Sequence, residues 1–304
     1  MNELFIFVTT ALVYTIRTKW NKYPNPNRKP LILDTELGDY QTQEILKRPT
    51  ISFSGCGTAY HFYMGVTEYM ADTFDISNVN VLCTSGSIWV AVPFILRRSV
   101  KEWHDNNWVD CYMRFSNRLF KLCLDSNTFI RKQLNDYLPP DAYKRCSNRL
   151  FIVLTKWSWI QCRFVQDIVY QYESNDQLID ALIGTINIPG IFYSPQYHRG
   201  KICWDGCFTN QKPLISNTAN HITTVGILGK SSDINTNNLF RFRDLMPILP
   251  SDCDFHRHWY SCGYTAAKHK QSVFDRSGFK RKKTYIDLGW VYDETSTNSI
   301  KILT

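Results

Sequence analysis

The sequence predicts a single α/β domain built on a mainly parallel sheet. A pattern of strand, tight turn and apolar helix occurs twice between residues 50 and 96, and this alternation is typical of parallel sheets. The chain has 304 residues, 44% of them apolar, so it can bury a substantial core. This composition excludes a disordered tail protein.

The first pattern starts with a short strand at 51–54. The glycine-punctuated turn G-C-G-T-A-Y follows at 55–60, and a helix that includes Met64 and Met70 comes next. Glycines placed directly after a strand indicate a tight turn rather than a continued strand.

The second pattern has a strand at 79–82, the turn C-T-S-G-S at 83–87 and an apolar helix at Ile88–Leu96. Aromatic and aliphatic residues at helical spacing then predict helical cover over 101–137. The other elements that we expect are a strand at 150–154, a helix at 177–183 that follows the capping run S-N-D, and a strand at 222–228.

The chain is mildly basic. Lys and Arg number 35 against 27 Asp and Glu, which gives a net charge of +8. This excess favours anionic partners such as lipid headgroups or nucleic acid, and a solvated basic face explains it equally well. The ten cysteines are spread along the chain without a C-x-x-C pair, so we expect reduced thiols and no zinc site.

The N-terminus differs from the rest of the chain. Residues 4–16 form an apolar run that, as a helix, would span only about 20 Å of the roughly 30 Å hydrocarbon core of a bilayer. Glu3 precedes this run and basic residues follow it, which argues against a signal peptide and favours a cytoplasmic location for everything after it. The run is either a membrane anchor or a helix of the globular domain.

Candidate catalytic residues lie in the turns after the predicted strands, where parallel α/β sheets bind ligands. Ser85 has the small residues Cys83 and Ser87 at positions −2 and +2, the arrangement that a nucleophile elbow needs. The segment fits an ordinary strand–turn–helix junction as well. Gly55 and Gly57 can cradle an anion, such as the oxyanion of acyl transfer, with successive backbone N–H groups.

A general base is needed beside such a serine. None of the seven histidines lies in a setting that marks a catalytic base, whereas Asp205 ends an apolar, strand-like stretch and precedes a glycine. A partly buried carboxylate can act alone as a general base. Because Asp-Gly is also a common turn, Asp205 taken by itself fits a turn residue too.

Several motifs occur together and in a fixed order. They are S-F-S-G-C-G at 52–57, the serine turn at 83–87, L-P-P-D-A at 138–142, A-L-I-G-T-I-N-I-P-G at 181–190, W-D-G-C-F-T-N at 204–210 and a downstream region from Leu245 to Tyr264. Together they resemble the patatin-like phospholipases, in particular the animal branch that includes adipose triglyceride lipase. The resemblance covers roughly residues 50–270, and the co-occurrence is far more specific than any single motif.

The resemblance implies a three-layer α/β/α domain that hydrolyses acyl esters of glycerolipids or phospholipids with a Ser–Asp dyad. Ser85 is then the nucleophile and Asp205 the general base. No cofactor and no metal ion are implied. The oxyanion hole that the resemblance implies consists of backbone N–H groups around Gly55, Cys56, Gly57 and Thr58, with help from Gly86.

The expected partners are a glycerolipid or phospholipid substrate and an anionic membrane surface or lipid droplet, with the catalytic domain on the cytoplasmic side. The basic residues between 268 and 283 fit docking on anionic membrane. They have little aromatic interleaving, so we expect no nucleic-acid partner. We divide the chain into a possible anchor at 1–20, a linker at 21–48, the patatin-like acyl hydrolase domain at 49–270 and a basic extension at 271–304.

Four residues depart from the family pattern. Tyr60 replaces the glycine that closes the first loop, Cys83 and Ser87 replace both elbow glycines, and Cys207 replaces the second glycine after Asp205. A Cβ at a tight turn adds strain. The alternative function is therefore a catalytically weak or inactive patatin-like protein that acts as a lipid-binding or membrane-tethered interaction module.

Overall fold

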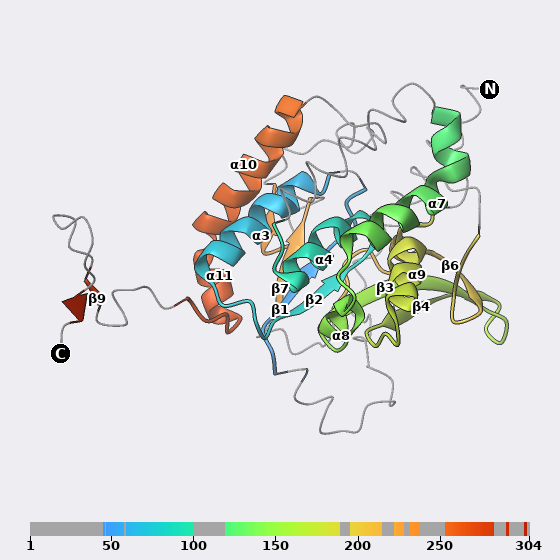
Figure 1. Cartoon of the computed structure of the whole chain (residues 1–304), viewed down its shortest axis with the longest axis horizontal. Coiled ribbons are helices and arrows are strands. Elements are labelled where there is room, and N and C mark those ends of the chain that lie inside the picture. The colour runs from blue at the N-terminus through green and yellow to red at the C-terminus, as the bar shows by residue number, and fades with distance from the viewer. Residues whose placement is uncertain are drawn as a thin grey trace.

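The structure is a computed structural model. It describes residues 45, 47–57, 59–99, 119–188, 195–214, 222–227, 232–236, 253–282, 290–291 and 301–302. Figure 1 shows a central sheet with helices packed around it. The apolar run at 4–16, the linker and most of the basic extension lie outside the described residues.

The central sheet has eight strands in the spatial order β5-β6-β3-β2-β1-β7-β8, with β4 also paired to β3. In chain order these strands are β1 (Thr50–Phe53), β2 (Asn80–Cys83), β3 (Leu150–Ser158), β4 (Arg163–Val169), β5 (Gln196–His198), β6 (Lys201–Asp205), β7 (Ile222–Gly226) and β8 (Ile234–Asn235). A separate antiparallel pair consists of β9 (Trp290–Val291) and β10 (Lys301–Ile302).

The helices confirm most of the predicted elements. They are α3 (His61–Thr73), α4 (Ile88–Leu96), α7 (Leu119–Tyr137), α8 (Ala142–Cys146), α9 (Asn175–Ile186), α10 (Cys253–His269) and α11 (Gln271–Arg276), with the 3-10 turns η1 (Ser85–Ser87) and η3 (Gly206–Phe208). The predicted helical cover at 101–137 is confirmed from residue 119 onward, and its first part lies outside the described residues.

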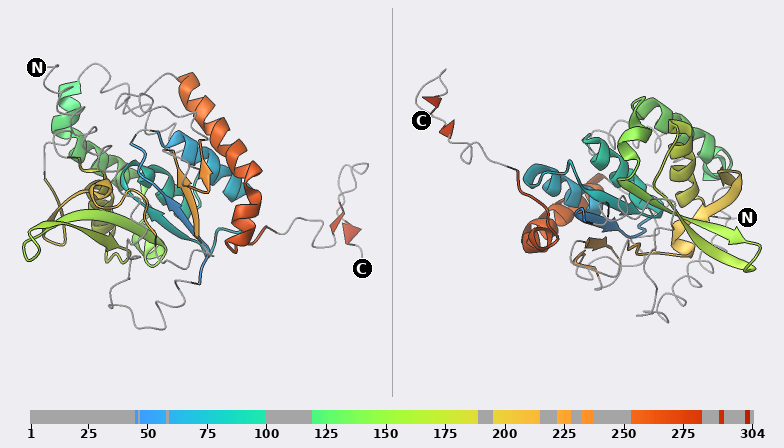
Figure 2. Two further views of the ribbon diagram at one scale, coloured as in Figure 1. Left: turned by 180° about the vertical axis from the view of Figure 1, so that it is seen from behind. Right: turned by 90° about the horizontal axis from the view of Figure 1, so that it is seen from below.

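The centre of the sheet is parallel. Strand β1 lies between β2 and β7, so that Thr50 pairs with Asn80 on one side and Ile222 on the other. Strands β2 and β3 are also parallel, whereas β4 and β6 run antiparallel to β3. Helices flank this mostly parallel sheet, as Figures 1 and 2 show, and the three-layer α/β/α fold class is confirmed.

The core is continuous from the sheet into the helices. Helix α3 packs against α4 and α10, α4 lies on β2 and β3, and α9 lies on β3 and β6. The central strands β1 and β2 are buried along their whole length, as expected for parallel strands with covered faces. Their carboxyl ends therefore open onto the turns that hold the candidate site.

The stretch after α10 packs on the domain as well. Phe274 and Phe279 are buried, and their rings pack at tilted and edge-on angles against Phe74 at the end of α3. The backbone is tied at the same place, because Lys282 donates its amide to the Thr73 carbonyl at 2.9 Å. The sequence did not indicate this packing, because the stretch was predicted to be a basic extension on account of its Lys and Arg residues, among which Phe274 and Phe279 lie.

Among the described helices, none has the length and apolar character needed to cross a membrane. The thiols that the structure shows to be free are those of Cys56, Cys83, Cys146, Cys162, Cys203, Cys207 and Cys262.

Candidate active site

Ser85 occupies a sharp turn between β2 and α4. Its backbone φ is +56°, in the left-handed region that residues with side chains rarely adopt. The turn η1 leads directly into α4. A strained serine between a strand and a helix is the geometry of a nucleophile elbow.

Ser87 closes this turn. Its hydroxyl donates to the Thr84 carbonyl at 2.8 Å and accepts from the Thr84 amide at 3.0 Å. Ser87 has an ordinary helical φ of −69°, and Cys83 is buried at the end of β2. Ser87 therefore lacks the backbone strain that was expected from replacing the second elbow glycine. The residue with the left-handed conformation is Ser85.

The serine is hydrogen-bonded to the candidate base. Its hydroxyl donates to Oδ2 of Asp205 at 2.6 Å across a sequence separation of 120 residues. Both residues are buried, with 5% and 2% of their surface exposed. The sheet brings them together along β3, where Ile152 pairs with Cys83 of β2 and Leu154 pairs with Asp205 of β6.

Asp205 is held at three points besides the serine. Its Oδ1 accepts from the Cys207 amide at 2.8 Å. Its own amide donates to the Asn187 carbonyl at 3.0 Å, and its carbonyl accepts from the Thr155 hydroxyl at 2.8 Å. These contacts fix the carboxylate so that Oδ2 stays directed at Ser85.

Burial raises the pKa of Asp205 to about 6 from an ordinary 3.8, while hydrogen bonds from Ser85 and Cys207 oppose the rise. Such a carboxylate is ionised at neutral pH and more basic than an exposed aspartate. Burial and the nearby charge of Asp205 also raise the pKa of the Cys207 thiol. This thiol is therefore neutral where Asp205 is charged.

Thr185 on α9 supports the elbow from behind. Its hydroxyl accepts from the Ser85 amide at 3.0 Å and donates to the Val153 carbonyl at 2.6 Å. It is completely buried. Sequence reasoning assigned it no role, although the motif at 181–190 contains it and was the signal that could have identified it.

We expect Thr185→Val to lower the free energy of unfolding by about 1–3 kcal/mol, because it leaves the Ser85 amide and the Val153 carbonyl buried without their partner. Thr185→Ser keeps the hydroxyl and should recover most of the loss. The matched control is Thr67→Val, since the buried Thr67 hydroxyl bonds only to carbonyls of its own helix. Urea unfolding measures all three, and a Thr185→Val variant as stable as wild type would contradict the support role.

The glycine loop after β1 packs against the serine turn. A Cβ on Gly86 would overlap the Gly57 carbonyl, and a Cβ on Gly55 would lie 3.4 Å from Cβ of Ser85. The Gly55 amide donates to the Gln211 carbonyl at 3.2 Å, and Nε2 of Gln211 donates back to the Gly55 carbonyl at 2.8 Å. The loop is thus clamped beside the hydroxyl.

Backbone N–H donors remain in this loop and in the serine turn beside it. Within the described residues, the amides of Cys56, Gly57 and Gly86 have no backbone acceptor, in contrast to that of Gly55. Gly57 has a φ of +56°, which favours glycine there. Thr58 lies outside the described residues.

The two remaining departures from the family pattern are accommodated by packing. Tyr60 is fully buried with a helical φ of −68°, and its ring stacks on His61 with centroids 4.4 Å apart. No glycine is required in that conformation. Sγ of Cys207 occupies the space that a Cβ on Gly55 would need, so the thiol fills the volume between the glycine loop and η3.

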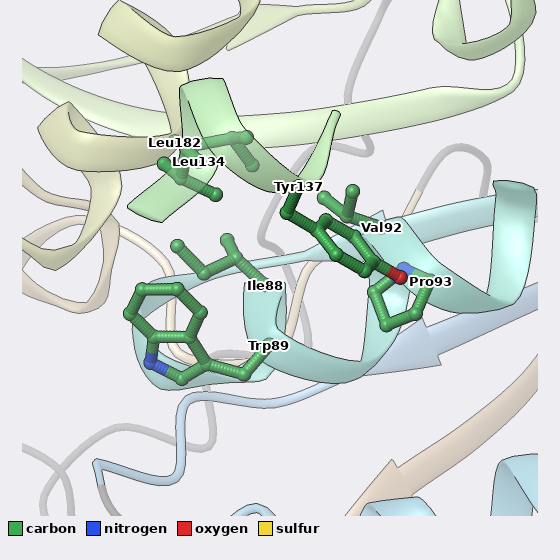
Figure 3. Close-up of a pocket in the computed structure, with 7 residues that line it drawn as sticks. All are labelled: Ile88, Trp89, Val92, Pro93, Leu134, Tyr137 and Leu182. Carbon is green, nitrogen blue, oxygen red and sulfur yellow. The ribbon is translucent and has the colours of Figure 1, made fainter. Parts of the chain in front are cut away.

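Figure 3 shows a small apolar hollow. Ile88 directly follows η1, and Leu182 lies one helical turn before Thr185 on α9. Helices α4, α7 and α9 all contribute to it. The residues that line the hollow are Ile88, Trp89, Val92, Pro93, Leu134, Tyr137 and Leu182.

The sheet is mostly parallel and carries a serine elbow, a buried Ser–Asp hydrogen bond and a glycine loop whose Cys56 and Gly57 amides have no backbone acceptor within the described residues. These features define the class of serine-elbow α/β proteins. The chain is 30% identical over 175 residues to patatin-like phospholipase domain-containing protein 5 of Homo sapiens, a match that covers 55% of this chain and 39% of the relative. No family model matches the chain. The predicted resemblance to the patatin-like phospholipases, a family of lipid hydrolases in general, is confirmed by this match.

Proposed function

We propose that the protein is a lipid acyl hydrolase, of the phospholipase A or acylglycerol lipase type, in which Ser85 is the nucleophile and Asp205 the general base. The observation that carries the proposal is the 2.6 Å hydrogen bond from the Ser85 hydroxyl to the buried Asp205 carboxylate. A strained elbow and a base of raised pKa support the same chemistry. The chain spans about 39% of the length of its curated relative.

The reaction proceeds in two acyl-transfer steps. The Ser85 oxygen attacks the ester carbonyl carbon while its proton passes to Oδ2 of Asp205. The carbon–oxygen bond to the leaving alcohol then breaks, and Asp205 returns the proton to that alcohol. Water next attacks the acylated serine, gives a proton to Asp205, and the proton returns to Ser85 as the fatty acid leaves.

The oxyanion of each step requires hydrogen-bond donors in the glycine loop and the serine turn. We assign this role to the amides of Cys56, Gly57 and Gly86, whose N–H groups have no backbone acceptor within the described residues. The Gly55 amide is already engaged by Gln211, so Gly55 contributes by letting Cys207 and the loop approach closely. Loss of one such donor typically costs about 10²–10³ in rate.

Support for a lipid substrate comes from the curated relative, which is described as containing a patatin-like phospholipase domain. We further propose that the domain works at a membrane or lipid-droplet surface on the cytoplasmic side.

The test is fluorophosphonate labelling of the full chain. We expect wild type to be labelled and Ser85→Ala to lose all labelling, because the probe reacts only with an activated serine. The matched control is Ser272→Ala, which changes an exposed serine of α11 and should label as wild type does. A folded wild type that resists the probe would contradict the proposal and favour the catalytically inactive lipid-binding module.

A further inference from the structure

Among the described residues, the three most exposed large apolar side chains lie on one hairpin. Strands β3 and β4 form a hairpin, and its tip (residues 158–163, hereafter the hairpin tip) carries Trp159 and Ile160, which are 84% and 97% exposed. Phe164, the first residue of β4 after the tip to face outward, is 53% exposed. Figure 2 shows this hairpin extending sideways from the body of the protein in both views. Monomeric proteins seldom expose adjacent large apolar groups without a use for them.

The tip is held in this shape by its own hydrogen bonds. The Gln161 amide donates to the Ser158 hydroxyl at 3.2 Å, and Nε of Arg163 donates to Oε1 of Gln161 at 2.8 Å. The Cys162 thiol donates to the Trp159 carbonyl at 3.4 Å. A turn fixed in this way presents its apolar groups at little entropic cost when it binds.

An aromatic series connects the tip to the sheet. The ring of Trp159 lies edge-on to that of Trp157, with the two centroids 6.1 Å apart. The ring of Phe164 makes edge-on contacts with Trp157, at a centroid distance of 5.2 Å, and with Trp204, at 5.3 Å. Trp204 directly precedes Asp205 on β6. The hairpin tip is therefore joined by packed rings to the strand that carries the candidate base.

The charges of the hairpin favour an anionic or phosphate-bearing surface. Residues 157–166 contain Arg163 and no Asp or Glu, and Asp167, the next carboxylate along the chain, is paired with Lys156. Trp is the residue that prefers the boundary between headgroups and acyl chains, where its ring is apolar and its N–H meets water. A narrow, convex tip also suits insertion into a lipid surface, whereas a protein partner would need a matching groove.

We propose that the hairpin tip is a lipid-surface anchor that inserts Trp159 and Ile160 below the headgroups, with Arg163 on the phosphates. Along β3, Trp159 lies five residues beyond Leu154, the partner of Asp205, which corresponds to about 16 Å of strand. The anchor thus holds the candidate site at a fixed, short distance from the surface. This inference rests on the proposed function only for the choice of lipid as the partner.

The deciding experiment is photo-cross-linking in the full chain carrying Ser85→Ala, so that vesicles stay intact and hydrolysis plays no part. Ile160→p-benzoylphenylalanine is irradiated with phosphatidylcholine vesicles that contain phosphatidylserine. We expect a covalent lipid adduct at position 160. The matched control is Leu214→p-benzoylphenylalanine, which places the same group at a 38% exposed leucine outside the hairpin and should give no adduct.

Vesicle flotation supplies the second readout. The double variant Trp159→Ser, Ile160→Ser should bind the same vesicles at least about tenfold more weakly than the Ser85→Ala parent, because two large apolar groups no longer leave water. Leu214→Ser should bind as the parent does. Absence of a lipid adduct at position 160, or a concentration-dependent dimer that the double variant abolishes, would overturn the anchor. Failed labelling of Ser85 by fluorophosphonate would overturn the hydrolase and leave these readouts unchanged.

Discussion

Asp205→Asn is expected to abolish hydrolysis and at the same time to make the folded protein more stable at neutral pH. The carboxylate is buried, and its pKa is raised to about 6, so keeping it ionised at pH 7.5 costs stability. The difference from the ordinary value of 3.8 corresponds to about 3 kcal/mol. Asparagine keeps an acceptor for the Cys207 amide without a charge.

The dependence on pH follows from the direction of this shift. The folded state holds the Asp205 proton more tightly than the unfolded chain, so the free energy of unfolding contributed by this group is highest below pH 3.8 and is lost as the pH rises through about 6. The Asp205→Asn variant has no ionisable group at this position, so its free energy of unfolding does not fall over this pH range. The gain in stability of the variant should therefore be full above about pH 6 and should vanish near pH 4. The hydrolytic activity of wild type should rise as the pH passes through about 6, where Asp205 of the folded protein ionises.

Urea unfolding between pH 4 and pH 8, together with ester hydrolysis, measures both effects. Asp136→Asn is the control, because Asp136 is an exposed aspartate on α7 and its replacement should change neither property. An Asp205→Asn variant that is less stable than wild type at pH 7.5 would show that the carboxylate is a structural group. Retained hydrolysis would show that it is not the base.

The central part of the fold was predictable because local and tertiary preferences agree there. The segments that became β1, α3, β2 and α4 combine apolar runs with glycine or small-residue turns. The bounds expected for β1, β2 and α4 agree with the structure within about two residues, and α3 was expected without bounds as a helix that includes Met64 and Met70. Strand β4 was missed because its sequence, R-F-V-Q-D-I-V, alternates weakly and is only partly buried. Its place is set by pairing with β3, which a local pattern does not reveal.

The candidate site was predictable in its parts and not in its connections. The turn residues around Ser85 and the Asp-Gly pair at 205 were found by motif, since elbows and strand ends have local sequence signatures. The hydrogen bonds from the Ser85 amide to Thr185 and within the Ser87 cap depend on how α9 and η1 pack. For that reason the elbow with two replaced glycines could not be judged from its composition, whereas the structure shows how Ser87 closes it.

Gly263→Ala is expected to destabilise the fold, although alanine is the better helix former. Helices α3 and α10 cross so closely that a Cβ on Gly263 would overlap the Phe62 carbonyl, and a Cβ on Gly65 would overlap the Tyr260 carbonyl. In an exposed helix the change from glycine to alanine stabilises by about 1 kcal/mol. Here the two backbones must separate, and overpacking of this kind typically costs about 1–3 kcal/mol or more.

The prediction separates tertiary contact from helix propensity, because the two have opposite signs at this position. Ser261→Ala on the exposed side of α10 is the control, since it improves propensity without touching α3 and should be neutral or slightly stabilising. Gly65→Ala, combined with Gly263→Ala, should cost less than the sum of the single changes, because one separation of the helices relieves both overlaps. Thermal unfolding decides the matter, and a Gly263→Ala variant more stable than wild type would show that α10 does not contact α3 at backbone distance.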